Sequence, residues 1–224
     1  MRSLSLAVAI LALPSLACAQ IRAGVPLDTL RSALAADALV LGEADVPDDA
    51  ALPVRLAILR RQEPVAILDV YVGDTHEEAL AWVTERAPAI SSARMVARSD
   101  GTFADTPIGP AGFVIAAHAN VAIVVRVSAS DVDAAAIAER VGAAIDSAPA
   151  ASTRISVPSP PTDDLAIGAS RPVQLPAWAM AARVVATGGG YARRTPRGWM
   201  ITRTSADPIV ARVLVVDRYL RISR

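Results

Sequence analysis

The chain has 224 residues, and its 22 basic and 22 acidic side chains give a formal net charge of zero. Every basic residue is an arginine, which excludes Schiff-base chemistry on a lysine and the lysine of a P-loop. A near-neutral chain also argues against a nucleic-acid partner. The length suits one large domain or two small ones with a sizeable core.

The N-terminal residues have the pattern of an export signal. Arg2 supplies a positive charge, and residues 4–13 form an apolar run. Ala17-Cys18-Ala19 then offers a small-x-small cleavage site, so residues 1–19 are predicted to be a signal peptide, with Gln20 beginning the mature chain. The apolar run is too short to cross a hydrocarbon core of roughly 30 Å. We therefore expect an exported protein, periplasmic or extracellular, with no transmembrane segment after signal removal.

Two alternatives treat the leader differently. An uncleaved leader would act as an anchor, and a lipid anchor would use Cys18 itself. The usual lipidation motif has leucine three residues before the cysteine, where this chain has Ser15, so signal cleavage fits the sequence better. Because Cys18 is the only cysteine, the mature chain can form neither a disulfide nor a cysteine-ligated zinc site.

The first part of the mature chain alternates short helical and extended patterns. We expect a helix over residues 25–36, a strand over 38–42, an acidic loop over 43–49, and paired strands over 53–60 and 64–72. Asp69 interrupts the apolar pattern of the last strand. A carboxylate there is expected either at a sheet edge or paired with an arginine.

The next segment predicts a long helix and a short strand. The helix starts at Asp74 or Thr75 and ends near Pro88, with Trp82 on its apolar side. A strand over residues 93–98, a turn over 99–102 and an irregular loop over 103–110 follow.

The most apolar stretch of the mature chain lies at residues 112–127. Residues 113–115 and 121–127 are rich in β-branched side chains at a period of two, which predicts a pair of antiparallel strands. Both faces are apolar until Arg126, so the pair should lie at the centre of a sheet. A tight turn is expected over residues 117–120, with Asn120 suited to a positive φ.

A second long helix is predicted between Ser130 and Pro149, with Ser130 and Asp133 in the capping pattern and Val141 on the apolar side. Trp82 and Val141 should both pack on the sheet. Residues 20–157 are therefore interpreted as an α+β domain, a mostly antiparallel sheet with two main helices on one face.

The C-terminal part begins with a linker. Residues 158–164 contain three prolines, which predicts a stiff linker over residues 158–168. Beyond it, residues 182–186, 198–204 and 209–216 are predicted strands, so residues 169–224 are interpreted as a small antiparallel β subdomain. One more strand is expected at residues 154–157.

No catalytic set, metal site or cofactor site emerges from the sequence. His76 and His118 are the only histidines, and neither has a second candidate ligand at metal-binding spacing. No G-x-S-x-G nucleophile motif occurs. The alternative is a small exported hydrolase that combines one histidine with Asp69, Asp100 or Asp105.

The charges are unevenly distributed along the chain. Residues 20–157 hold 11 arginines and 18 acidic residues, whereas residues 158–224 hold 10 arginines and 4 aspartates. Arg193, Arg194 and Arg197, with Trp199 nearby, form the best candidate binding loop, because guanidinium groups suit anionic groups and aromatic rings can stack. The simpler alternative is that arginines decorate the solvent face of a sheet.

These observations favour an exported, non-enzymatic binding or scaffold protein of the cell envelope. The candidate partners are anionic lipid, polysaccharide or another envelope protein, contacted through the arginine-rich loop.

Overall fold

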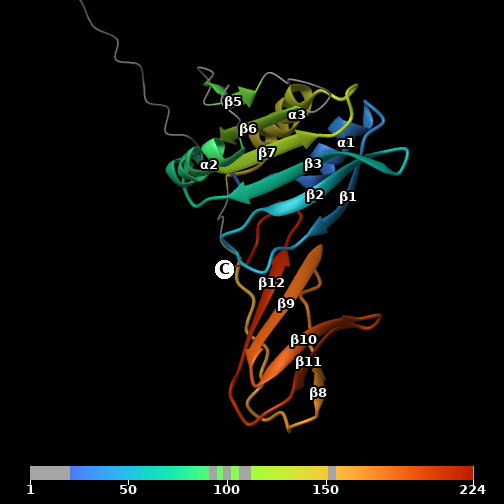
Figure 1. Ribbon diagram of the computed structural model, residues 1–224, viewed down its shortest axis with the longest axis vertical. Coiled ribbons are helices and arrows are strands. Elements are labelled where there is room, and N and C mark those ends of the chain that lie inside the picture. Colours follow the sequence, from blue (N-terminus) through green and yellow to red (C-terminus); the bar gives the residue numbers. More distant parts are fainter. Residues whose placement is uncertain (1–20, 91–94, 98–101, 106–111, 151–154, 224) are drawn as a thin grey trace, which may run out of the picture.

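The computed structural model describes residues 21–90, 95–97, 102–105, 112–150 and 155–223. Figure 1 shows two lobes, an upper one built around a large sheet and a lower one containing β8–β12, with the C-terminal end between them. The predicted signal peptide and most of the predicted turn over residues 99–102 lie outside the described residues. No helix in the described ranges is both long and apolar enough to cross a membrane.

The first lobe contains one antiparallel sheet of seven strands in the order β1-β2-β3-β7-β6-β5-β4. Its elements in chain order are α1 (Leu27–Ala35), β1 (Val40–Asp45), β2 (Val54–Arg60), β3 (Glu63–Val72), α2 (His76–Ile90), β4 (Met95–Ala97), β5 (Thr102–Asp105), β6 (Phe113–His118), β7 (Val121–Val127) and α3 (Ala134–Ser147). The predicted irregular loop over residues 103–110 is thus wrong for β5; residues 106–110 lie outside the described part. Asp133, and not Ser130, caps α3 through a hydrogen bond from the Ala135 backbone N–H.

The central hairpin is confirmed, and its turn is tighter than predicted. Strands β6 and β7 pair from Phe113↔Arg126 to His118↔Val121, which leaves Ala119 and Asn120 as the turn. Ala119 has the positive φ, 50°, so the expectation for Asn120 is wrong. The Asn120 side chain is fully buried instead, because its amide donates to the carbonyl oxygens of Gly73 and Arg22.

The two long helices lie on opposite faces of the sheet, which corrects the prediction that they share one face. On β7, Ile123 belongs to the same buried cluster as Val141 of α3, whereas the adjacent Val124 belongs to the cluster of Trp82 from α2. Neighbouring strand residues point to opposite faces. Both faces of β6 and β7 are apolar, so each face needs its own helical cover.

Both helices are otherwise oriented as expected. Trp82 is 7% exposed and Val141 is fully buried. Helix α1 joins α3 on its face of the sheet, and its residues Leu27, Leu30 and Leu34 are buried there. The α+β class with a separate small β subdomain is therefore confirmed.

The second lobe consists of two small antiparallel sheets, β10-β11-β8 and β12-β9. Its strands are β8 (Ser170–Pro172), β9 (Ala181–Gly188), β10 (Gly190–Thr195), β11 (Gly198–Arg203) and β12 (Ile209–Val216). The three predicted strands correspond to β9, β11 and β12, whereas β8 and β10 were missed. Residues 155–157 form no strand, and residue 154 lies outside the described part.

The end of the chain packs into the first lobe. Leu214, Val216, Leu220 and Ile222 belong to the same core cluster as α1. Backbone N–H groups of Val25 and Leu27 donate to the carbonyl oxygens of residues 219 and 218. The two lobes are therefore joined by a shared apolar core and by hydrogen bonds, besides the chain connection.

Candidate functional site

A groove of about 1110 Å³ lies between β1 of the first lobe and β9 of the second. Consecutive residues of each strand line it, residues 41–46 on one side and 181–186 on the other. A strand that presents one face contributes alternate residues, because its side chains alternate between faces. The uninterrupted runs indicate that both strands turn an edge toward the groove.

Sheet topology agrees with this arrangement. Strand β1 is the edge strand of the large sheet and pairs with β2 alone, and β9 pairs with β12 alone. Edge strands present unpaired N–H and C=O groups that can pair with another chain. The groove therefore lies between two strand edges from two different sheets.

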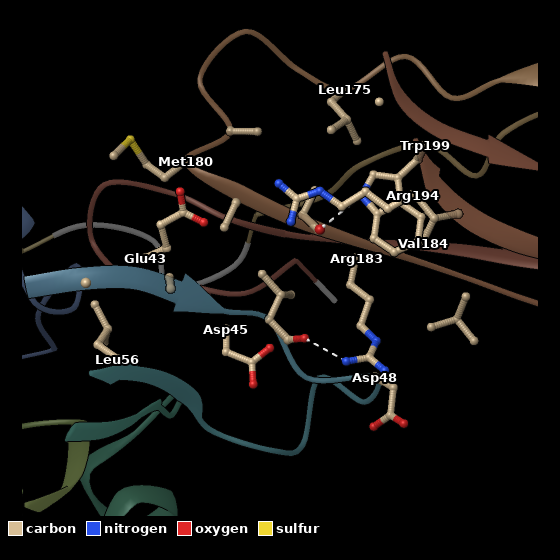
Figure 2. Close-up of a pocket in the computed structure, with 18 of the residues that line it drawn as sticks. Glu43, Asp45, Asp48, Leu56, Leu175, Met180, Arg183, Val184, Arg194 and Trp199 are labelled. Carbon is tan, nitrogen blue, oxygen red and sulfur yellow. Dashed lines mark hydrogen bonds between the residues drawn. The ribbon is translucent and has the colours of Figure 1, made fainter. Parts of the chain in front are cut away.

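The walls carry mainly opposite charges, and Arg31 of α1, which is paired with Asp28, is the basic residue on the first-lobe side. Glu43, Asp45 and Asp48 come from the β1 side, and Arg183 and Arg194 come from the side of the second lobe. In Figure 2 the Glu43 carboxylate and the Arg194 guanidinium extend into the space between β1 and β9 from opposite walls. No salt bridge between these walls is found in the described ranges.

Two hydrogen bonds fix the walls without pairing their charges. The Arg183 guanidinium donates to the carbonyl oxygen of Val46 at 3.3 Å and so bridges the two lobes. The Trp199 indole N–H donates to the carbonyl oxygen of Ala182 in β9 at 3.2 Å. Both bonds are drawn in Figure 2. They fix the positions of a guanidinium and an aromatic ring in the groove wall.

Apolar side chains line the rest of the groove. Leu56 and Val184 are buried there, whereas Leu175 and Met180 remain 37% and 48% exposed. The groove thus offers both charged and apolar contacts.

The structure brings together only some of the predicted binding residues. Arg194 lies directly opposite Trp199 in the β10–β11 pairing, and both line the groove. Arg193 pairs with Met200 and points to the other face of the strand, because it is adjacent to Arg194. Arg197 is exposed in the turn that follows β10. Arg193 and Arg197 do not line the groove.

The acidic wall was missed because residues 43–49 were interpreted as a loop. In the structure Glu43 and Asp45 belong to β1 and are exposed, with the less exposed Ala44 between them. This alternation of charged and small residues was a signal that the strand continues beyond residue 42.

Both histidines make contacts within the fold. The Nδ1 atom of His76 contacts the carbonyl oxygen of Ala119. The His118 ring packs against α3, where a Cβ atom added to Gly142 would lie 2.8 Å from its Nε2 atom. Within the described ranges, no three potential metal ligands converge.

Asp69 is paired, as one of the two predictions for it required. It is 2% exposed, and its carboxylate accepts two hydrogen bonds from Arg55, at 2.6 and 3.0 Å. Arg126 approaches the same carboxylate at 3.3 Å. The hydrogen bond to Asp69 raises the pKa of Arg55. Two arginines thus occupy one of the three carboxylates that the hydrolase hypothesis names. Asp100 lies outside the described residues, and Asp105 ends β5.

No family model and no curated protein matches this chain. A solved structure of a GTP-binding regulator from Thermotoga maritima is similar at 16% sequence identity, with a TM-score of 0.39, over 56% of this chain and 94% of that chain. A similarity this distant carries no argument about function.

Proposed function

We propose that this protein is an exported, non-enzymatic binding protein of the cell envelope and that the groove between β1 and β9 holds its ligand. The observation that carries the proposal is the pair of oppositely charged walls, which face each other across the groove without a salt bridge between them. The signal-peptide pattern in residues 1–19 supports the location.

The charges of the groove favour a ligand that carries both signs. Glu43, Asp45 and Asp48 would attract a cationic group, and Arg194 would attract an anionic group. Guanidinium groups bind carboxylates and phosphates through paired hydrogen bonds. Trp199 lies beside Arg194 and adds an aromatic surface of the kind found at the centre of binding sites.

Site-specific photo-crosslinking in the native cells tests this proposal. A photoreactive amino acid replaces Leu175 or Met180, which line the groove and are 37% and 48% exposed, and Arg193 or Glu139 outside it. Arg193 is the matched control, since it is exposed in the same lobe but does not line the groove. We expect the two groove positions to give the same adduct and the two control positions to give none. Equal crosslinking at positions 180 and 193 would contradict the proposal.

The location is tested separately. Cell fractionation followed by N-terminal sequencing should find the mature chain outside the cytoplasm, beginning at Gln20. A full-length chain that still begins at Met1 in the cytosolic fraction would show that the predicted location is wrong, whatever the groove binds.

A further inference from the structure

We propose that the ligand of the groove is an extended polypeptide segment that adds to the free edge of β9 as a new strand. This inference rests on the proposed function, because it assumes that the groove is the binding site. It adds the chemical class of the ligand and the atoms that recognise it.

Strand β9 has the geometry of a template for strand addition. It pairs with β12 in an unbroken register from Ala181↔Val216 to Gly188↔Ile209, and β12 is its only partner strand in the described ranges. Strand β1 is less suitable, because its register with β2 shifts between Leu41 and Ala44. Such irregularities protect sheet edges from pairing with other chains.

The hydrogen bond from Trp199 shows which backbone groups of β9 face the groove. The carbonyl oxygen of Ala182 accepts from the Trp199 indole, so it points away from β12. Alternate residues of a strand turn their N–H and C=O groups to the same side. Val184 and Ala186 therefore turn their backbone groups to the same side, and both residues line the groove; Ala186 is half-buried and Val184 is 4% exposed.

An extended polypeptide is the ligand class that matches such an edge. Its N–H and C=O groups repeat with the spacing of the strand it joins, about 3.3 Å per residue. Lipids and polysaccharides carry no such array of donors and acceptors. A strand lying along β9 would also pass between the acidic wall at Glu43 and Asp45 and the basic wall at Arg194. We therefore expect a segment with a basic side chain on the β1 side and a carboxylate on the Arg194 side.

The experiment uses the mature chain, residues 20–224, and short linear peptides selected against it from a random displayed library. The best peptide is then synthesised with an ordinary backbone and in two N-methylated forms, one methylated at its odd residues and one at its even residues. N-methylation removes a backbone donor and leaves the side chains unchanged. Because the protein is unaltered, a folding defect cannot produce the result.

We expect one methylated form to bind about 10- to 100-fold more weakly, since it loses the hydrogen bonds to the carbonyl oxygens of Val184 and Ala186. The other form should bind about as tightly as the unmodified peptide. Hydrogen exchange at the amides of Val184 and Ala186 should slow when the unmodified peptide binds. Arg194→Glu should weaken binding, and the matched control Arg193→Glu should not.

Each other result contradicts the inference in a distinguishable way. If binding depends on Arg194 but neither methylated form is weakened, the groove binds peptides without strand addition. If no selected peptide depends on Arg194 while photo-crosslinking at position 180 yields a lipid or glycan adduct, the ligand class is wrong and the proposed function stands. If position 180 yields no adduct either, both proposals are wrong.

Discussion

The two lobes differ in how their strands are covered. In the first lobe the central strands β6 and β7 are covered by α3 on one face and α2 on the other, so Ile123 and Val124 are both buried. The second lobe has no helix in its described residues, and its two sheets enclose a smaller cluster around Val184 and Ile201. The first lobe therefore holds most of the apolar core, and the second leaves the edge of β9 open toward the groove.

Both lobes contain salt-bridged arginines, such as Arg55 in the first and Arg171 in the second. Within the described residues no salt bridge is found for Arg183 or Arg194 at the groove, and the Arg183 guanidinium donates to the carbonyl oxygen of Val46. The arginines of the groove wall thus differ from Arg171 of the same lobe in having no carboxylate partner.

The largest effect on stability is expected at Leu220. This residue follows β12 but is 1% exposed in the core of the first lobe. Leu220→Ala should lower the free energy of unfolding by about 2–5 kcal/mol, because it leaves a cavity in that core. Urea denaturation measures the change. The control Val210→Ala, at a residue of β12 that is 57% exposed, should stay within about 0.5 kcal/mol of the wild type. Equal effects would show that the chain end does not belong to the first core.

A smaller effect is expected at Asn120 in the central hairpin. Its side chain is fully buried and bonds to the Gly73 carbonyl and to the backbone of Arg22. Asn120→Ala should cost about 1–3 kcal/mol, because these buried backbone groups lose their partner. Ser32→Ala on the exposed side of α1 is the control and should be nearly neutral. If both variants unfold at the wild-type urea concentration, the hairpin turn does not depend on this side chain.

The strands that the sequence predicts are those with a strong apolar pattern. β7 carries β-branched residues at alternate positions, and burial of both its faces follows from that pattern. β10 was missed because Gly190-Tyr-Ala-Arg-Arg-Thr195 has no apolar alternation. Its strand conformation depends on pairing with β11, which is a tertiary contact that local propensity does not encode.

The groove could not be predicted from the sequence, for a related reason. Arg194 and Trp199 could be chosen as binding residues from their chemistry, and the structure does place them together. Glu43 and Asp45 lie far away in the chain, and they meet the second lobe only because the segments around Val25 and Leu220 join the two lobes. A single sequence contains no periodic signal for such a meeting of strand edges.

The next prediction tests whether Trp199 supports the edge of β9. Trp199→Phe keeps an aromatic ring and removes the indole N–H that donates to Ala182. We expect a loss of about 0.5–1.5 kcal/mol, the usual net value of one hydrogen bond. Trp178→Phe is the matched control, because Trp178 is 46% exposed and its indole makes no hydrogen bond within the described residues. In chemical denaturation, Trp199→Phe should lose more stability than Trp178→Phe. The reverse order would show that the Trp199 indole does not stabilise β9.

The smallest effect concerns the salt bridge that fixes the linker to β8. Arg171 donates two hydrogen bonds to the Asp164 carboxylate, at 2.8 and 2.9 Å, and these lower the pKa of Asp164. The lowered pKa in the folded state means that the stabilisation is present above the unfolded-state pKa of about 3.9 and is lost as the pH falls through the folded-state value. Asp164→Asn should therefore remove part of the acid dependence of the melting temperature. Asp163→Asn, the neighbouring control, should keep the wild-type dependence. Identical acid profiles for Asp164→Asn and the wild type would mean that this bridge makes no contribution to stability, as is common for exposed pairs.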